Sequence, residues 1–280
     1  MIWTAGTFRF DLSTRPLVMG IVNATPDSFS DGGQHPDADA LIAHGERLLS
    51  EGADILDIGG ESTRPGAQPV DAAAEWQRIE GAVEHFAKQG ACVSVDTMKP
   101  AVMQLALAAG AAIINDVAGF CAPEAVQAVA GSNCGVIIMH MQGEPRTMQQ
   151  EPHYDNVVKD VAAFLARQAQ TLEHAGVAAQ RIMVDPGFGF GKTLTHNLAL
   201  LGHIGDVGGG YPVMAGVSRK SMLGLITGRA VHDRQAASVA AALLAVQHGA
   251  HVVRVHDVAA TVDALKVWAA VKGTAADTAP

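Results

Sequence analysis

The chain of 280 residues has few cysteines, few aromatic side chains and no long apolar run. Its three cysteines lack the CxxC spacing of common metal and redox sites, which predicts free thiols in a reducing, cytoplasmic compartment. No apolar run approaches the roughly 18 residues that a membrane-spanning helix needs. The chain does not open with a basic segment followed by a long apolar one. We therefore expect neither a membrane span nor a secretion signal.

Positive charge is also scarce, since 19 Lys and Arg stand against 28 Asp and Glu and the formal net charge is -9. Such an acidic chain is not expected to bind nucleic acid or an anionic membrane. It can still bind a small anion where a few cations are placed together. The apolar fraction of 49% and the 30 glycines are typical of a close-packed globular protein with a substantial core.

Eight short apolar runs recur along the chain, and a polar residue, a loop and a helical pattern follow each of them. A short apolar run without alternation is typical of a strand that is buried on both faces. Strict alternation of strands and helices requires parallel strands joined by right-handed crossovers. The predicted strands cover residues 17–22, 55–58, 92–95, 112–114, 136–139, 182–184, 213–217 and 252–255.

Eight such units in this length predict a single α/β domain over residues 1–280, folded as a (β/α)8 TIM barrel. An open, doubly wound sheet is the alternative. Residues 7–12 alternate in polarity before a turn, which predicts half of a short N-terminal β-hairpin that closes one end of the fold. Residues 273–280 are small and polar and are predicted to form a flexible tail. In barrels of this kind the chemistry takes place at the carboxyl ends of the strands.

Polar side chains at the predicted strand ends offer hydrogen-bond acceptors. A single Asp before a helix is commonly only a helix cap, but so many polar ends on one rim favour a binding site. Asp96, Asn115 and Asp185 suit a flat heterocycle with several N–H donors, because a carboxylate accepts two of them side by side. Asn23, at the end of the first strand of the barrel, and the Asp residues of the loop that follows it offer oxygen ligands for a hard cation such as Mg2+.

The same rim carries positive charge, which suggests a pocket for an anion, most simply a phosphate. For Arg64 and Arg219 the alternative is solvated loop charge, and for Arg254 it is a contact at the barrel bottom or at an interface. Arg254 and His256 are two residues apart on a strand, so both are expected to face the same side. The predicted cationic set is Arg64, Arg219, Lys220, Arg254 and His256.

Two further features have simpler interpretations. Residues 187–192 resemble a phosphate-binding loop, but Pro186 stands where the Walker motif needs glycine. We interpret this segment as a glycine-rich turn whose Phe188 and Phe190 can pack against a ring. His140 has no second His or Cys at ligand spacing, which favours a site-lining or structural role over metal binding.

Longer motifs at these strand ends resemble those of dihydropteroate synthases, a family of pterin-binding enzymes. Residues 19–32, which read MGIVNATPDSFSDG, resemble the first pterin-binding signature of the family. Residues 54–66, which read DILDIGGESTRPG, resemble the second. The likeness covers the chain except for the first dozen residues and the tail. It continues through residues 94–97, 114–116, 139–143, 184–192, 218–221 and 254–257.

The resemblance implies an enzyme of folate biosynthesis. It implies condensation of 6-hydroxymethyl-7,8-dihydropterin diphosphate with 4-aminobenzoate to 7,8-dihydropteroate, by a dissociative substitution at the pterin methylene that releases diphosphate. It also implies a homodimer and a Mg2+ cofactor, with Asn23 as the metal ligand. The catalytic residues that it implies are Asp96, Lys220, Arg254 and His256.

The resemblance also implies which residues bind the substrates. The implied pterin contacts are Asp96, Asn115, Asp185 and Lys220, and the implied diphosphate contacts are Thr63, Arg254 and His256. Those bordering 4-aminobenzoate are Phe29, Pro65, Phe188 and Ser221. Further implied substrate contacts are Arg64, Met139, Phe190, Gly216 and Arg219.

Two other functions are compatible with parts of this pattern. A pterin-binding methyltransferase domain shares the barrel and the acidic pterin site, but it needs a corrinoid partner and lacks several of these motifs. A non-catalytic pterin-binding protein can lose residues of the anion pocket without losing the fold. Here Asn23, Lys220, Arg254 and His256 are all present, which favours the synthase.

Overall fold

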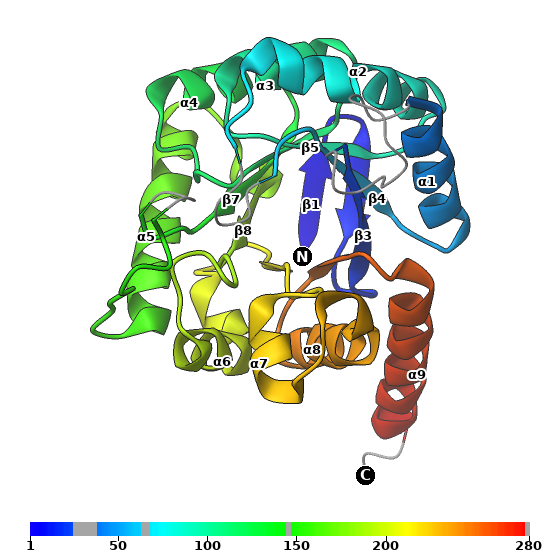
Figure 1. Ribbon diagram of the computed structural model, residues 1–280, viewed down its shortest axis with the longest axis vertical. Coiled ribbons are helices and arrows are strands. Elements are labelled where there is room, and N and C mark those ends of the chain that lie inside the picture. The colour runs from blue at the N-terminus through cyan, green and yellow to red at the C-terminus, as the bar shows by residue number, and fades with distance from the viewer. Residues whose placement is uncertain (25–37, 63–67, 144–146, 278–280) are drawn as a thin grey trace.

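The computed structural model describes residues 1–24, 38–62, 68–143 and 147–277, with side chains up to residue 273. Its main sheet has eight parallel strands arranged as a barrel, which confirms the predicted fold class (Figure 1). The strands are β3 (Leu17–Asn23), β4 (Ile55–Gly59), β5 (Val93–Asp96), β6 (Ile113–Asp116), β7 (Gly135–Met139), β8 (Ile182–Asp185), β9 (Met214–Ala215) and β10 (Val252–Val255).

The barrel closes at its shortest strand. The strands neighbour one another in the order β8-β7-β6-β5-β4-β3-β10-β9, and a bridge between Val184 and Val213 joins the two ends of this series. The Val184 N–H donates to the Pro212 carbonyl at 2.9 Å. The strand predicted over 213–217 is ordered as a strand only at 214–215. Pro212, which precedes it, has no N–H to donate to a strand ladder.

Helices surround the barrel (Figure 1). Among the described residues, none of them is long and apolar enough to cross a membrane. The last helix continues to Asp277, so residues 273–277, predicted as part of a flexible tail, are helical; this segment contains alanines, which favour helix. The helices are α1 (Ala38–Ser50), α2 (Ala72–Lys88), α3 (Pro100–Ala108), α4 (Pro123–Ala130), α5 (Val157–His174), α6 (Leu194–Gly202), α7 (Ser221–Thr227), α8 (Gln235–Gln247) and α9 (Val258–Asp277). Short 3-10 helices cover Ala179–Arg181, Ile204–Val207 and Val231–Asp233.

A two-stranded hairpin precedes the barrel, as predicted. Strands β1 (Ile2–Ala5) and β2 (Phe8–Asp11) pair antiparallel. Trp3 is fully buried, and its indole N–H donates to the Arg181 carbonyl at 3.1 Å. The hairpin packs on apolar side chains from the first half of the barrel strands and closes that end of the barrel. These side chains are Leu17, Met19, Ile55, Ile113, Ile137, Met183, Met214 and Val252.

Replacement of Trp3 by alanine tests how much this hairpin stabilises the barrel. We expect the free energy of unfolding to fall by about 3–5 kcal/mol, because the change removes a large buried ring and leaves a cavity. Urea unfolding of Trp3→Ala measures the loss, with Phe8→Ala as the control because Phe8 is only half-buried. If Trp3→Ala lowers the free energy of unfolding no more than Phe8→Ala does, Trp3 does not stabilise the closed end of the barrel as proposed.

The strand alternation places polar groups above this apolar layer. Side chains two residues apart on a strand point to the same side of the sheet. The residue two positions after each of these apolar side chains therefore also points into the barrel, one layer nearer the carboxyl ends. Five strands change there from an apolar side chain to a polar one or to glycine. The pairs are Ile55 and Asp57, Ile113 and Asn115, Met183 and Asp185, Met214 and Gly216, and Val252 and Arg254. The mouth of the barrel is therefore polar although its base is apolar.

Candidate active site

A pocket lies at the carboxyl ends of the barrel strands, and we call it the inner pocket. It brings together nine of the residues predicted from the sequence, although they come from distant parts of the chain. Val117 and Gly187 also line it and were not predicted. The nine predicted residues are Asp96, Asn115, Met139, Asp185, Phe188, Phe190, Gly216, Lys220 and Arg254.

One side of the inner pocket is apolar. Met139 and Phe190 are largely buried and cluster with Val117 and Met148. The ammonium group of Lys220 lies 4.2 Å from the centre of the Phe190 ring, a distance at which a cation interacts favourably with an aromatic face. This wall suits the face of a flat ring, while the polar groups opposite suit its edge.

Asp185 and Asn115 supply hydrogen-bonding groups deep in the pocket. The Asp185 carboxylate is 4% exposed, and its Oδ1 accepts a hydrogen bond from the Gly187 N–H at 2.7 Å. Its Oδ2 faces Gly216, where even an added Cβ would lie 3.6 Å away. Burial raises the pKa of Asp185, while the Gly187 N–H and the nearby cations lower it. The Asn115 amide donates to Asp57 Oδ2 at 3.3 Å, which fixes the orientation of its side chain.

Arg254 bridges two carboxylates across the barrel mouth. Its Nε lies 2.5 Å from Asp57 Oδ2, and its Nη2 lies 2.7 Å from Asp96 Oδ2. Asp57 is fully buried, and its Oδ1 has no hydrogen-bond partner among the described residues. Asp57 is not among the site residues predicted from the sequence. The alternation on β4 was the signal, because Asp57 is the inward residue that follows Ile55.

Asp96 has the most unusual ionisation of the pocket. Its pKa is raised to about 7 from an ordinary value of 3.8. Burial is the largest cause, and the negative charges of Asp57 and Glu75 add to it, whereas Arg254 and Lys220 act in the opposite direction. Arg254 remains charged, because Asp57 and Asp96 together raise its pKa even though burial lowers it. A carboxyl that titrates near neutral pH in a pocket is a candidate for a functional role.

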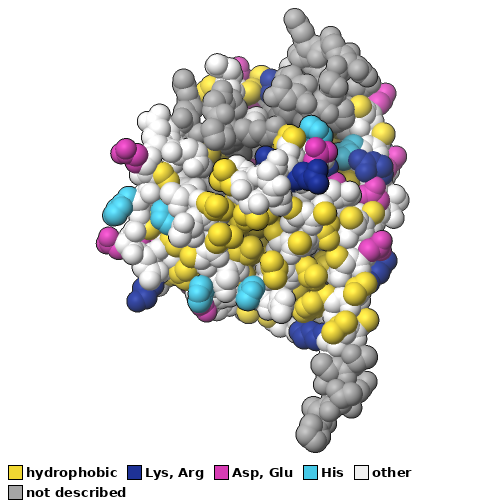
Figure 2. All heavy atoms as spheres, turned by 60° about the horizontal axis from the view of Figure 1, so that its bottom comes forward, with side chains coloured by type: hydrophobic (Ala, Val, Ile, Leu, Met, Phe, Trp, Pro, Cys, Tyr) yellow, Lys and Arg dark blue, Asp and Glu magenta, His cyan; other side chains and the backbone are white. Residues whose placement is uncertain are grey.

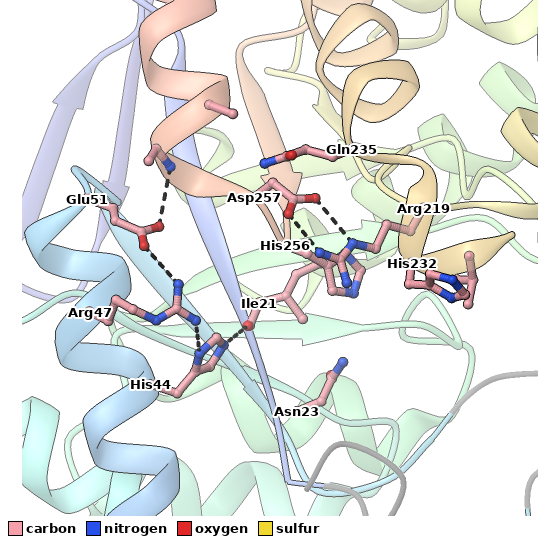
Figure 3. Close-up of a pocket in the computed structure, with 13 residues that line it drawn as sticks. Ile21, Asn23, His44, Arg47, Glu51, Arg219, His232, Gln235, His256 and Asp257 are labelled. Carbon is pink, nitrogen blue, oxygen red and sulfur yellow. Dashed lines mark hydrogen bonds and ion pairs between the residues drawn. The ribbon is translucent and has the colours of Figure 1, made fainter. Parts of the chain in front are cut away.

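A second, larger cavity of about 620 Å3 adjoins the barrel rim, and we call it the outer cavity (Figure 3). It is lined on one side by α1 and on the other by the segments around Arg219 and His256, with Asn23 on β3 (Figure 3). Ser218 positions His256, because its Oγ accepts from the His256 backbone N–H at 3.2 Å and lies 3.0 Å from Nδ1. His256 therefore presents an imidazole to this cavity beside Asn23.

The predicted rim cations divide between the two cavities. Arg219 has a left-handed backbone with φ 57°, and its guanidinium pairs with Asp257 in the outer cavity at 2.7 Å. Lys220, the next residue, lines the inner pocket. Arg254 and His256 are likewise separated, although sequence alternation predicted that they face the same side. Arg254 is drawn into the inner pocket by its two carboxylates.

The turn that separates Arg219 from Lys220 is held by Arg234, which sequence reasoning missed. The Arg234 Nη1 donates to the Arg219 carbonyl at 3.1 Å and to the Lys220 carbonyl at 3.4 Å. Ser221 is exposed and is the first residue of α7. It does not line the described part of either cavity.

His140 and Lys192 form a buried pair beneath the glycine-rich turn. Lys192 Nζ lies 2.9 Å from His140 Nδ1 and donates to the Phe190 carbonyl at 2.9 Å. Burial, followed by the charge of Lys192, lowers the pKa of His140 to about 3, so the imidazole is neutral. These contacts support a structural role for both residues, and they agree with the interpretation of residues 187–192 as a turn.

Four predicted site residues lie outside the described residues. They are Phe29, Thr63, Arg64 and Pro65. Among the described residues, no group of three or more His, Cys, Asp or Glu is placed to hold a metal ion.

The fold and the two cavities are those of a barrel enzyme whose site suits a planar ring with several N–H donors beside an anion. Comparison with known proteins agrees with this class. The family model described as "Pterin binding enzyme" matches residues 19–256. The dihydropteroate synthase of Neisseria meningitidis serogroup C is 51% identical over 96% of this chain and 97% of its own length.

Solved structures extend the likeness to three dimensions. Dihydropteroate synthase from Burkholderia cenocepacia, in complex with 7,8-dihydropteroate, is 52% identical with a TM-score of 0.91 over 99% of this chain and 98% of its own. The Xanthomonas albilineans enzyme with 4-aminobenzoic acid is 50% identical with a TM-score of 0.89 over 97% and 96%. The chain therefore belongs to the pterin-binding enzyme family and, within it, to the dihydropteroate synthases.

Proposed function

We propose that this protein condenses 6-hydroxymethyl-7,8-dihydropterin diphosphate with 4-aminobenzoate to give 7,8-dihydropteroate and diphosphate. The observation that carries the proposal is the inner pocket, where Asp96, Asn115 and Asp185 face an apolar wall. This arrangement suits the amino-pyrimidinone edge and the flat face of a pterin. The outer cavity beside it has the cationic side chains and the room that a diphosphate needs.

The reaction divides naturally between these two cavities. In the inner pocket, Asp185 and Asn115 orient the pterin edge, and Lys220 holds the ring from the side of Phe190. Arg254 from the inner pocket and His256 from the outer cavity take up the charge that develops on a diphosphate lying where the two cavities meet, as the methylene C–O bond breaks and its electron pair leaves with oxygen. The ionised Asp96 stabilises the cationic methylene. The neutral aniline nitrogen then forms the C–N bond and loses a proton to the departing diphosphate, so no nucleophilic side chain is required.

A test of this order of events is positional isotope exchange. The substrate carries 18O between the methylene carbon and the first phosphorus, and 4-aminobenzoate is replaced by benzoate. If the C–O bond breaks first and re-forms, the label is expected to appear in the non-bridging positions of that phosphorus. Recovery of unscrambled substrate after prolonged incubation with active enzyme would contradict the dissociative order.

Mg2+ is proposed as the cofactor. Mg2+ in proteins commonly binds one or two side-chain oxygens, with substrate phosphate oxygens and water completing an octahedron. Asn23 fits such a minimal site, because its amide borders the outer cavity beside His256. Bound there, Mg2+ would neutralise charge on the leaving diphosphate.

The proposed reaction is tested by product analysis. The purified protein is incubated with dihydropterin diphosphate, 4-aminobenzoate and Mg2+, and 7,8-dihydropteroate is quantified by chromatography. Omission of each component in turn is the control. Product is expected only from the complete mixture. Failure to form it, together with methyl transfer from a methylated folate to a corrinoid, would instead support the methyltransferase alternative.

A homodimer is proposed on the basis of an exposed apolar face. Figure 2 shows hydrophobic side chains gathered where α6, α7 and α8 lie at the bottom of Figure 1. Leu225 on α7 is 69% exposed, and Ile226 beside it is 54% exposed. Monomeric proteins rarely expose large contiguous apolar patches. In the proposed homodimer, a second copy of this chain covers the apolar face.

The variant Leu225→Glu is expected to convert a dimer into a monomer, because it places a charge on this apolar face. Sedimentation velocity measures the change in mass. Val271→Glu, on α9, is the matched control, since Val271 is 65% exposed. A wild-type protein that sediments as a monomer, or a Leu225→Glu variant that remains a dimer, would contradict this assignment.

A cytoplasmic location is also proposed. The three cysteines are free thiols, with Cys92 and Cys134 buried and Cys121 exposed. Free thiols persist in a reducing compartment. Fractionation of the source cells, followed by immunoblotting, tests this location. Recovery of the protein outside the cytoplasmic fraction would contradict it.

A further inference from the structure

A buried ion-pair cluster lies beyond the inner pocket, where the segments after β4 and β5 leave the barrel. Lys99 Nζ lies 2.5 Å from Glu61 Oε2 and 2.5 Å from Glu75 Oε2. The Glu75 side chain is fully buried, and those of Glu61 and Lys99 are 8% and 21% exposed. We call these three residues the Lys99 cluster. Burial of so much charge away from a ligand is costly, which calls for a functional reason.

The backbone connects the Lys99 cluster directly to Asp96. Asp96 pairs with Gly59 in the barrel, and Lys99 follows Asp96 by three residues. On the other strand, Gly60 packs so closely on α2 that an added Cβ would lie 2.6 Å from the Glu75 carbonyl oxygen. The Lys99 cluster therefore joins the segment that follows β4 to the segment that follows β5, close to where each strand ends.

The same cluster organises the segment that follows β4. Glu61 Oε2 contacts Lys99, while its Oε1 accepts a hydrogen bond from the Val70 N–H at 2.9 Å. The Arg78 guanidinium adds a hydrogen bond to the Gly60 carbonyl at 2.9 Å. Every described contact of Glu61 thus holds the beginning of this segment against its end and against the turn after β5.

Glu75 connects the charge of the cluster to Asp96, because its negative charge raises the pKa of that carboxyl. Lys99 remains an ammonium, because its hydrogen bonds to Glu61 and Glu75 raise its pKa although burial opposes them. One positive charge thus stands between two carboxylates, and Glu75 Oε1 has no partner among the described residues. Loss of Lys99 would leave the charge of Glu75 unopposed. The charged groups that act on Asp96 are Arg254 on β10, Asp57 on β4, Glu75 on α2 and Lys220 before α7.

We propose that Lys99 is a positioning residue for the condensation reaction proposed above: by holding Glu61 and Glu75, it fixes the segments around Asp96 and offsets the buried negative charge behind it. The inference rests on the proposed function for its catalytic meaning. Its physical content is that Glu75 raises the pKa of Asp96 and that Lys99 opposes the charge of Glu75, so loss of Lys99 and loss of Glu75 are expected to move the pKa of Asp96 in opposite directions. A purely structural role does not produce opposite effects from two substitutions in one cluster.

The test compares the pH dependence of kcat/KM in Lys99→Met and Glu75→Gln. In the wild type, kcat/KM is expected to rise with pH as Asp96 ionises, and we call this rise the acidic limb. Lys99→Met is expected to move the midpoint of the acidic limb to higher pH by about one unit. This shift lowers kcat/KM roughly tenfold below the midpoint and leaves it unchanged at alkaline pH. Glu75→Gln is expected to move the limb downward. Lys99→Arg keeps the charge and is expected to restore the wild-type profile. Lys88→Met is the matched control, because Lys88 forms an exposed pair with Glu84 on α2.

The proposal would be overturned if kcat/KM fell by the same factor at every pH. It would also be overturned if Lys99→Met and Glu75→Gln moved the midpoint of the pH profile in the same direction. If Lys99→Met does not fold, as judged by circular dichroism, the sign of the Glu75→Gln shift decides. The 13C NMR titration of the Asp96 carboxyl in the same variants does not depend on turnover. Opposite shifts in that titration support the proposal even if no dihydropteroate forms, which would count against the proposed function alone.

Discussion

The variant Asp185→Asn is expected to weaken pterin binding by roughly 10²- to 10⁴-fold. Hydrogen bonds to a charged group contribute about 1.5–3 kcal/mol each, and a carboxylate can accept two from an amino-pyrimidinone edge. Each 1.4 kcal/mol corresponds to a tenfold change in affinity. The amide in the variant presents an N–H donor toward an edge that also donates. One hydrogen bond is lost, the other loses the contribution of the negative charge, and the new donor faces a donor, which together give the stated range.

Calorimetric titration with 6-hydroxymethyl-7,8-dihydropterin diphosphate measures this loss. Asp206→Asn is the matched control, because Asp206 is an exposed carboxylate that contacts only His203 among the described residues. It is expected to bind like the wild type. The Asp185→Asn variant keeps a side chain of the same shape beside Gly187, so thermal unfolding should confirm a folded protein. If Asp185→Asn binds the pterin diphosphate as tightly as the wild type, Asp185 does not hold the amino-pyrimidinone edge.

The variant Asp96→Asn is expected to lower kcat by about 10²- to 10³-fold while leaving pterin binding largely intact. Removal of one preorganised electrostatic group from an active site typically has an effect of this size. Asp96 acts on charge that develops during the reaction, whereas Asp185 acts on the bound ring. In the variant, Arg254 keeps its ion pair with Asp57. An unchanged kcat would exclude the proposed role of Asp96.

The pH dependence follows from the raised pKa of Asp96. The carboxyl is protonated below about pH 7 and ionised above it. Because the ionised form stabilises the cationic methylene, kcat/KM is expected to rise as the pH increases through about 7. The Asp96→Asn variant should lack this limb, while titration of the substrate phosphates affects both proteins equally. A limb that persists unchanged in Asp96→Asn would assign it to another group.

Much of the inner pocket was predictable because its residues stand at the ends of apolar strands. Asp96, Asn115 and Asp185 needed only the strand pattern and the rule that parallel strands end on one rim. Asp57 obeys the same alternation, but a fully buried carboxylate at a strand end resembles a loop cap until its partner is known. That partner, Arg254, lies 197 residues away in the sequence.

The division of the cations between two cavities was not predictable from the sequence. Arg219 and Lys220 are consecutive, and only the left-handed backbone of Arg219 and the contacts of Arg234 send them in different directions. The Lys99 cluster was hidden for a related reason. Lys99 is 38 residues from Glu61 and 24 from Glu75, so no local pattern connects them.

The proposal that the inner pocket forms dihydropteroate and releases diphosphate is tested most directly by measuring both products in parallel, in the wild type and in Lys220→Ala. Lys220 lies between the apolar wall and the carboxylates of the inner pocket, so its loss should disable the site without affecting the fold. We expect equal amounts of the two products, dependent on 4-aminobenzoate in the wild type and nearly abolished in Lys220→Ala. Tight pterin binding by a wild-type protein that releases no diphosphate would contradict this proposal and would identify a non-catalytic pterin-binding protein.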